Sequence, residues 1–358
     1  MFRLDAMRRV ARLATLLILV SPVACAGEPG SAPAARDYRV VTLADGLKHP
    51  WSIAILPDGG FLISERPGRL RIFREGALQE AAVPGLPEIA ATGQGGLLDV
   101  VPHPRFAENR WLYFSYAAEA GRGVTTHLAR ARFEQDALKD VEVLFVAEPA
   151  SRGGRHFGSR IVFDDEGFLY LSVGDRGDRP RAQHLDDHAG SIVRLHDDGR
   201  IPDDNPFVGN PDARPEIYAY GVRNPQGMAL HPRTGALWEH EHGPRGGDEI
   251  NVIEAGRNYG WPVISHGIDY SGAAIGDGIR AHPGMEQPLH VWTPSIAPSG
   301  MAFYRGEAFS GWDGDLLVGA LAHRHLARLR VDAEGRVVSE VRMLGELNRR
   351  IRDVRVHE

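Results

Sequence analysis

The chain has 358 residues, enough for one large domain or two ordinary ones. Charged residues make up 25% and hydrophobic residues 43%, as in folded globular proteins, so a disordered chain is excluded. The net charge is only −6, and no basic stripe or interleaving of aromatic and basic residues occurs, which excludes nucleic acid as an expected partner.

The N-terminal segment has the order of a secretory signal peptide. Arg8, Arg9 and Arg12 precede an apolar run over 13–20, which is too short to span a membrane, and small residues follow. We therefore expect a signal peptide over 1–26, a linker over 27–36 and one domain over 37–358. This organisation predicts an exported protein of the periplasm.

Cys25 is the only cysteine, so no intramolecular disulfide can form. Two interpretations of Cys25 stay open. It lies within a removed peptide that is cut after Ala26, or it is the lipid-carrying first residue of a lipoprotein whose signal ends at Ala24. The second interpretation predicts a membrane anchor, but Pro22 stands where a lipobox usually has Leu.

A turn that leads into a short apolar strand recurs along the domain. Five copies begin at Asp58, Glu108, Glu166, Thr234 and Asp313, and long amphipathic helical periods are absent. Four short strands repeated every ~40–50 residues are typical of propeller blades. We predict an all-β propeller. A β-sandwich or a pair of small β domains is the alternative, which five similar copies along the whole chain disfavour.

The spacing of the copies predicts two irregularities. The later copies lie further apart, which indicates inserted loops, one of them over 272–288. A sixth copy is due soon after 352–354, and the sequence stops at Glu358. We expect that the last blade is either completed in another way or lacks a strand, which would leave an unpaired edge.

Polar residues follow the repeated strands, and His156 is the first candidate for chemistry among them. It stands among glycines in 153–160, where backbone and ligand can approach closely. A neutral imidazole is the usual group for accepting a proton near pH 7, and Asp175, after the next strand, is placed to orient it. The alternative is a histidine in a surface loop.

Arg223 and Asn224 form the second candidate site. The guanidinium fork and the amide stand side by side before a proline, which suits an anionic ligand rich in oxygen. The alternative is an Asx-Pro turn with a surface arginine.

The segment 239–249 is rich in His, Glu and Asp. Its Gly-Pro and Gly-Gly pairs forbid the helix that a His-Glu-x-x-His zinc site needs. Backbone carbonyls and carboxylates in such a loop suit calcium better. The alternative is a solvated charged loop.

Together these segments resemble the soluble quinoprotein glucose/sorbosone dehydrogenase family, and most closely its aldose sugar dehydrogenase branch. The resemblance extends over about 47–354. It is carried by six strings in order, at 93–98, 154–160, 201–207, 221–227, 241–251 and 258–262.

The resemblance implies a six-bladed propeller that binds pyrroloquinoline quinone and calcium and oxidises an aldose to its lactone. It implies that His156 is the catalytic base and Asp175 its neighbour. The implied cofactor-binding residues are Gln94, Arg223, Asn224, Tyr270, Arg350 and Arg352. The implied calcium ligands are the carbonyls of Gly243 and Pro244 beside the quinone, and Glu249 with the Tyr259 carbonyl at a second, structural site.

One departure from the family pattern concerns the cofactor site. Glucose dehydrogenases of the family carry a lysine after a Ser-Leu or Ala-Leu pair, whereas here Ala322 follows. We therefore expect one cationic contact to be lost or shifted. The resemblance names no electron acceptor and no oligomeric state.

Two other functions stay open from the residues. One is a propeller without a cofactor that binds a sugar or a protein. The other is a calcium-dependent lactonase, in which His156 would activate water. A lactonase would turn over a lactone with no electron acceptor present.

Overall fold

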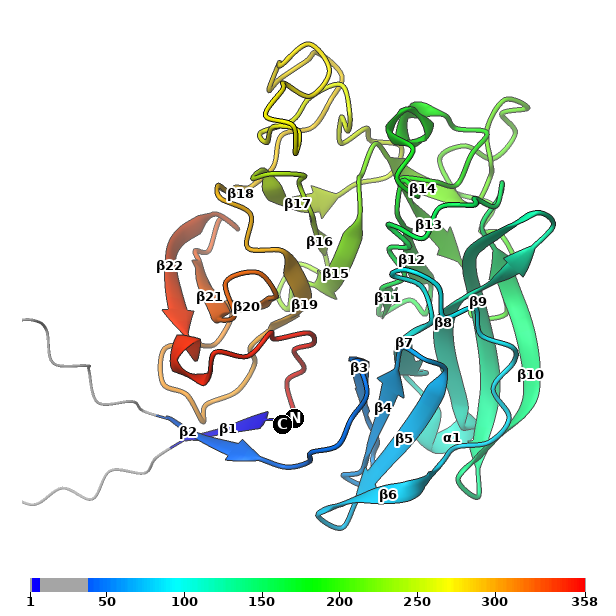
Figure 1. The fold of residues 1–358 in the computed structure, drawn as a ribbon, viewed down its shortest axis with the longest axis vertical. Helices are drawn as coiled ribbons and strands as arrows, with labels where there is room; N and C mark the ends of the chain where they lie inside the picture. Colours follow the sequence, from blue (N-terminus) through cyan, green and yellow to red (C-terminus); the bar gives the residue numbers. More distant parts are fainter. Residues whose placement is uncertain (1, 7–37, 358) are drawn as a thin grey trace, which may run out of the picture.

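The strands of the computed structural model form a β-propeller, described over residues 2–6 and 38–357. Five four-stranded antiparallel sheets are arranged as blades around a central axis (Figure 1). Within each blade the strands pair in chain order, so every blade is a meander. The prediction of an all-β propeller is confirmed.

The blades take up most of the described chain. The first contains β3 (Pro50–Ile55), β4 (Phe61–Glu65), β5 (Arg69–Arg74) and β6 (Ala77–Ala82). The second contains β7 (Leu97–Pro102), β8 (Trp111–Ala120), β9 (Gly123–Glu134) and β10 (Ala137–Val146), with the short helix α1 (Phe106–Asn109) after β7. The third contains β11 (Ile161–Phe163), β12 (Leu169–Val173), β13 (Ser191–Leu195) and β14 (Ile217–Tyr220), with the 3-10 helix η1 (Arg179–Gln183) after β12. The fourth contains β15 (Pro225–Leu230), β16 (Leu237–Glu241), β17 (Asp248–Ile253) and β18 (His290–Trp292). The fifth contains β19 (Pro298–Phe303), β20 (Leu316–Ala320), β21 (Leu326–Val331) and β22 (Val337–Met343).

The five repeated copies of the sequence all fall on the second strand of a blade, β4, β8, β12, β16 and β20. At the first copy, Asp58 Oδ1 accepts the N–H of Gly60 at 3.0 Å. Gly59 has a φ of +80°, a conformation that glycine adopts without strain. These residues close the β3–β4 hairpin, so the apolar strand begins at Phe61.

The cores lie between the blades. Every residue of β12, β13, β16 and β20 is buried, whereas the outermost strands β6, β10 and β22 are largely exposed. Leu62 of the first blade packs with Leu112 of the second, and Ile250 of the fourth packs with Val318 of the fifth. Each such buried side chain contributes about 1.5–3 kcal/mol, so stacking of the blades holds the inner loops in place.

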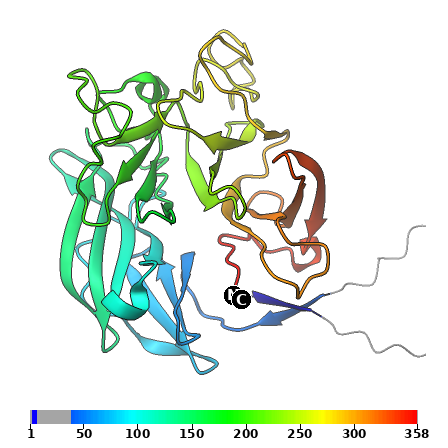
Figure 2. The ribbon, with the colours of Figure 1, turned by 180° about the vertical axis from the view of Figure 1, so that it is seen from behind.

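The prediction of six blades is wrong for the described residues, which form five four-stranded blades. At the sixth position, between the fifth and first blades, the only strands formed by described residues are β2 (Tyr38–Thr42) and β1 (Phe2–Ala6), which pair antiparallel (Figures 1 and 2). Between β22 and residue 357, the last one described, there is one 3-10 helix, η2 (Gly345–Leu347), and no strand. The backbone of the C-terminal residues instead hydrogen-bonds to the fifth blade, where the Gly300 N–H donates to the Arg352 carbonyl at 3.0 Å. These residues therefore form no strand ladder of their own.

The ring is closed by residues 351–355, which we call the ring-closing segment. Ser299 Oγ of the fifth blade donates to the Ile351 carbonyl at 2.6 Å. Asp353 Oδ2 accepts the N–H of Ile53 of the first blade at 2.9 Å, and Arg355 Nη2 lies 2.8 Å from Asp99 Oδ1 of the second. The expected open edge is therefore bridged by side chains instead of by a strand ladder.

The predicted signal peptide and linker fall mainly outside the described residues. Of the range 1–36, only Phe2–Ala6 is described, as β1, and Cys25 lies outside. No helix in the described part of the chain is long and apolar enough to cross a membrane.

Candidate active site

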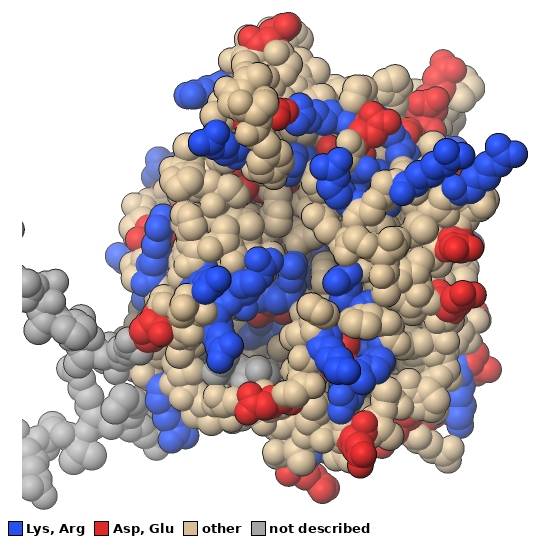
Figure 3. Space-filling view, in the orientation of Figure 1, with Lys and Arg blue, Asp and Glu red and all other residues tan. Residues whose placement is uncertain are grey.

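Residues far apart in sequence meet at one end of the blades. In an antiparallel meander, the connection into the first strand and the connection after the second strand lie at the same end. Gln94, His156 and Arg223 precede first strands, and Asp175 and Gly243 follow second strands. Figure 3 shows Lys and Arg side chains gathered beside the central hollow of the propeller.

His156 and Asp175 form a buried hydrogen-bonded pair. His156 Nδ1 lies 2.6 Å from Asp175 Oδ1, which also accepts the N–H of Gly177 at 2.7 Å. Asp175 Oδ2 accepts the indole N–H of Trp261 at 2.8 Å. The carboxylate is thus an acceptor on both oxygens, which places the imidazole proton of His156 on Nδ1. No described residue hydrogen-bonds to Nε2, which leaves its lone pair for a substrate proton.

The surroundings favour a neutral imidazole. Burial lowers the pKa of His156 below its ordinary 6.5, and the hydrogen bond and charge of Asp175 oppose this shift. Burial alone would raise the pKa of Asp175, but its hydrogen bond and charge interaction with His156 lower that pKa overall. A neutral imidazole beside an ionised carboxylate is the arrangement that a general base needs.

Two amide side chains hold the loop that carries His156. Gln94 Oε1 accepts the His156 N–H at 2.8 Å, and Asn224 Oδ1 accepts the Gly158 N–H at 3.2 Å. Gly174 lets the loop approach, because a Cβ at this position would lie 2.3 Å from the His156 carbonyl oxygen. The amide nitrogens of Gln94 and Asn224 have no partner among the described residues. They are therefore available to a ligand beside His156.

The predicted arginines carry positive charge without counterions. Arg223 Nη1 donates to the carbonyls of His242 at 2.7 Å and Gly243 at 3.2 Å, while its buried Nε has no partner in the described structure. Arg352 Nη1 donates to Gln226 Oε1 at 2.7 Å. Within the described ranges, no carboxylate forms an ion pair with Arg223, Arg350 or Arg352.

The charge on Arg352 is poorly accommodated by the protein alone. Burial, together with the charges of Arg350 and Arg160, lowers the pKa of Arg352 to about 10. Arg350 itself is exposed. A ligand with several carboxylates would relieve this repulsion, so these residues fit the predicted cofactor.

The fourth blade holds a cluster of three buried carboxyl groups. Glu239 and Glu241 lie on β16, and Glu249 on β17 pairs with Glu241 in register. Burial raises the pKa of Glu241 to about 8, and burial and neighbouring carboxylates raise the pKa values of Glu239 and Glu249. Neither carboxylate oxygen of Glu239 has a hydrogen-bond partner in the described structure. Such a group of carboxylates fits a cation.

A small cavity adjoins these carboxylates, with Glu241, Glu249 and Tyr259 in its wall. Its volume is about 10 Å³, room for one water molecule or one ion. The described residues contain no group of three or more His, Cys, Asp or Glu side chains arranged to hold a metal by themselves. A cation here would therefore need backbone oxygens or water as further ligands.

The other predicted calcium ligands are less favourably placed. The Gly243 carbonyl faces the guanidinium of Arg223, and the Gly243 N–H donates to Asp248 Oδ1 at 2.8 Å. Pro244 is buried beside it. In this arrangement the Gly243 carbonyl is engaged by a cation of the protein itself.

Tyr270 lies apart from the other predicted cofactor-binding residues. Its side chain is 65% exposed, on the loop between β17 and β18. The preceding residue, Asp269, forms an ion pair with Arg179 of η1, whose guanidinium lies 5.6 Å from the Trp261 ring. The structure thus links the loop to the site through Arg179 and shows no direct contact of Tyr270 with His156.

Sequence reasoning missed Trp261 and Glu241 as parts of the site. Both lie in strings that carry the family resemblance, but nothing in their spacing shows that an indole N–H reaches Asp175. Glu241 accepts the Arg223 N–H and lines the small cavity. The alternation of Glu239 and Glu241 along a strand was the available signal, because it places both on one face.

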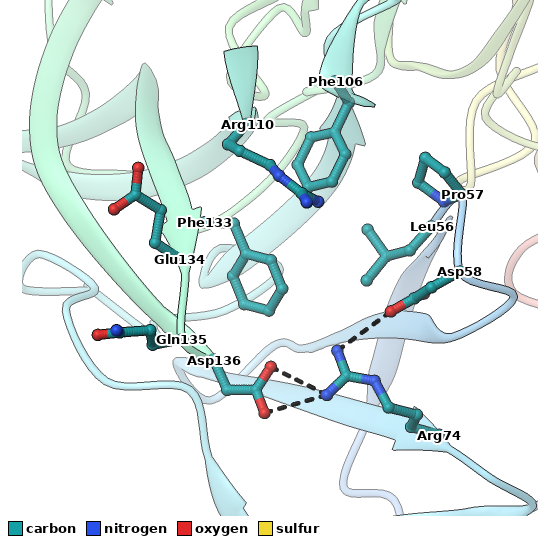
Figure 4. Close-up of a pocket in the computed structure, with 10 residues that line it drawn as sticks. All are labelled: Leu56, Pro57, Asp58, Arg74, Phe106, Arg110, Phe133, Glu134, Gln135 and Asp136. Carbon is teal, nitrogen blue, oxygen red and sulfur yellow. Dashed lines mark hydrogen bonds and ion pairs between the residues drawn. The ribbon is translucent and has the colours of Figure 1, made fainter. Parts of the chain in front are cut away.

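A larger hollow lies at the other end of the first two blades (Figure 4). Phe106 and Phe133 form its apolar floor, and its volume is about 450 Å³. Arg74 at its rim is paired with Asp58 and Asp136, at 3.4 and 3.1 Å. The hollow adjoins the turns between first and second strands and between third and fourth strands. It therefore lies at the opposite end of the blades from the loop of His156.

Comparison with known proteins matches residues 47–358 to the model of the family described as Glucose / Sorbosone dehydrogenase. The aldose sugar dehydrogenase YliI of Escherichia coli is 44% identical over 330 residues, 91% of this chain and 88% of that protein.

Two solved structures are similar along most of their length. The apo-form of the soluble aldose sugar dehydrogenase of E. coli has a TM-score of 0.85 and 43% identity, and covers 88% of this chain and 92% of that one. The aldose sugar dehydrogenase of Streptomyces coelicolor, solved in its PQQ-bound form, has a TM-score of 0.72 and 26% identity, with 87% and 86% covered.

Proposed function

Because this chain belongs to the glucose/sorbosone dehydrogenase family, we propose that it oxidises an aldose at C1 to the lactone with pyrroloquinoline quinone as the oxidant. The PQQ-bound form of the Streptomyces relative supports the choice of cofactor. The aldose sugar dehydrogenase of E. coli supports the substrate class.

The observation that carries this proposal is the His156–Asp175 pair at 2.6 Å, with Nε2 of His156 unengaged. In the proposed reaction, Nε2 accepts the proton of the anomeric hydroxyl as the C1–H bond breaks and the C1=O bond of the lactone forms. The bound quinone accepts the hydride from C1. Asp175 keeps Nδ1 protonated and stabilises the imidazolium that results.

The cations without counterions would hold the carboxylates of the cofactor. Arg223 and Arg352 offer guanidinium groups, and the free amide nitrogens of Gln94 and Asn224 offer neutral donors beside the base. Arg350 and Tyr270 would contribute from the exposed rim. Ala322, where glucose dehydrogenases have a lysine, is exposed and offers no side-chain donor.

We propose calcium as the second cofactor. Glu249 and the Tyr259 carbonyl, with Glu241 beside them, would hold one ion in the small cavity. The Gly243 and Pro244 carbonyls would hold another next to the quinone, where it would polarise the accepting carbonyl. The second ion requires that the Arg223 guanidinium turn away from the Gly243 carbonyl.

Reconstitution tests the function. Purified protein is loaded with pyrroloquinoline quinone and calcium, and aldoses are screened with an artificial acceptor dye. His156→Ala should lower kcat by about 10²–10⁴-fold while the quinone titration stays nearly unchanged, because the base contributes to chemistry and other residues to binding.

Three outcomes would refute the proposal. Retention of more than about a tenth of kcat in His156→Ala would remove the base. Turnover of a lactone without an acceptor would indicate a hydrolase. No absorbance change and no stabilisation on adding quinone with calcium would indicate a propeller that only binds.

We further propose that the protein is exported to the periplasm, either freed by cleavage after Ala26 or held by a lipid on Cys25. The basic, apolar, small-residue order of the first 26 residues supports this. Mass spectrometry of the mature N-terminus from a native host tests the proposed export.

We also infer that β2 and the ring-closing segment stand in the place of the sixth blade.

A further inference from the structure

The indole of Trp261 is the third member of the hydrogen-bonded chain that ends at His156. Its Nε1 donates to Asp175 Oδ2 at 2.8 Å, and Asp175 Oδ1 lies 2.6 Å from His156 Nδ1. Trp261 is 4% exposed and Asp175 is 0% exposed. The indole therefore has one acceptor within reach, and that acceptor is the carboxylate that orients the base.

The indole is itself held from several sides. The Trp261 N–H donates to the Gly221 carbonyl at 2.8 Å, and the Trp261 carbonyl accepts Gln183 Nε2 at 2.8 Å. The guanidinium groups of Arg223 and Arg179 lie 5.2 and 5.6 Å from the ring centre. A ring fixed in this way gives its N–H a defined direction, and an indole N–H can only donate.

We propose that Trp261 is a positioning residue for His156. By donating to Oδ2, it fixes the rotation of the Asp175 carboxylate, so that Oδ1 faces Nδ1 and Nε2 faces the substrate. Without this donor the carboxylate is held by the Gly177 N–H on Oδ1 alone and can turn about that contact, so that its alignment with Nδ1 and the preference for the Nδ1–H tautomer are weakened. Only the kinetic test of this inference rests on the proposed function, because the spectroscopic test needs no turnover.

Trp261→Phe tests this role, because it removes the N–H and keeps a ring beside the two arginines. Trp238→Phe is the matched control. Trp238 is 2% exposed in the core between the fourth and fifth blades, and its indole N–H has no hydrogen bond among the described residues. Both variants lose ring volume, but only one loses a donor to Asp175.

The first readout is the ring nitrogen-15 spectrum of His156 in protein free of quinone and calcium, assigned with His156→Ala. It reports which nitrogen carries the proton. Trp261→Phe should lose the uniform Nδ1–H form, and Trp238→Phe should keep it. An unchanged Nδ1–H form in Trp261→Phe would overturn the proposal, whatever the activity of the protein.

The second readout is kinetic. Trp261→Phe should lower kcat at least about 10-fold, a part of the 10²–10⁴-fold that a positioned base contributes in full, with little change in KM. If Trp261→Phe does not fold, Trp261→Tyr replaces it, because its hydroxyl is another donor. Tautomer and kcat should then be retained or lost together, and loss of kcat with an unchanged tautomer would overturn the proposal. A wild-type protein that turns over no aldose would refute the proposed function, while the tautomer still decides the role of Trp261.

Discussion

Arg355 offers a direct test of how this propeller closes its ring without a sixth four-stranded blade. Its Nη2 lies 2.8 Å from Asp99 Oδ1 and 3.0 Å from Ser52 Oγ, and its Nε lies 3.0 Å from Asp353 Oδ2. Arg355→Ala removes all three contacts. It thereby removes the segment's ion pair with Asp99 of the second blade and its bond to Ser52 of the first, while Asp353 keeps the N–H of Ile53.

The expected loss of stability depends on which contacts Asp99 keeps when Arg355 is removed. Removing one partner of a buried ion pair costs about 3–5 kcal/mol. The Arg355 side chain is 23% exposed, and Asp99 keeps Arg160 Nη1 at 3.1 Å and the Ile161 N–H at 2.9 Å. We therefore expect a loss of about 2–3 kcal/mol, at or just below the lower end of that range. For a domain of this size, this corresponds to a fall in Tm of about 3–5 °C.

Thermal unfolding of parent and variant, with and without quinone and calcium, measures the effect. Arg336→Ala is the matched control, since the 69% exposed Arg336 side chain pairs only with Asp332 and Glu334 at a surface turn. This control should lose no more than about 0.5 kcal/mol.

A second measurement follows from the position of Arg352 in the same segment. Quinone affinity should fall together with Tm in Arg355→Ala, because the segment that carries Arg352 is loosened. A Tm within about 1 °C of the parent would show that the segment does not hold the ring shut. A lower Tm with an unchanged quinone titration would show that ring closure and the cofactor site are independent.

Three further predictions concern the site. Arg223→Ala should weaken quinone binding by about 2–5 kcal/mol, since a cofactor carboxylate loses its partner; superimposable titration curves of parent and variant would contradict this. The acid limb of the kcat/KM profile should have its midpoint below pH 6.5, because burial lowers the pKa of His156 and only the neutral form accepts a proton. Asp175→Asn removes the interactions that raise this pKa, so the limb should move to lower pH as kcat falls, and an unmoved limb would refute the assignment. Calcium added to chelator-treated protein should raise stability, by about 2.7 kcal/mol at 100 times Kd. Glu249→Gln should lose most of this gain and the exposed Glu334→Gln none, as calorimetry can check.

The repeat pattern of the sequence predicted the architecture, because each copy encodes a local structure. A turn residue followed by alternating apolar positions specifies a strand wherever it occurs, and all five copies lie on second strands. Loops after those strands and before the next blade meet by topology alone, so His156, Asp175 and Arg223 could be grouped before any distance was known. The number of blades could not be predicted in the same way, since it depends on how the residues after β22 meet the first blade, which is distant in sequence.

Only the tertiary structure decided which way the side chains of the site and of the ring-closing segment point. The sequence by itself determined a propeller of repeated strands, a histidine among glycines and an arginine beside an asparagine before a proline. The packed blades decided that Trp261 reaches Asp175, that Asp353 and Arg355 close the ring, and that Gly243 faces Arg223. Each of these contacts joins residues from different blades or loops, and its geometry depends on how neighbouring blades stack around the axis. Periodicity along one strand carries no information about that stacking, so local pattern alone could not predict these contacts.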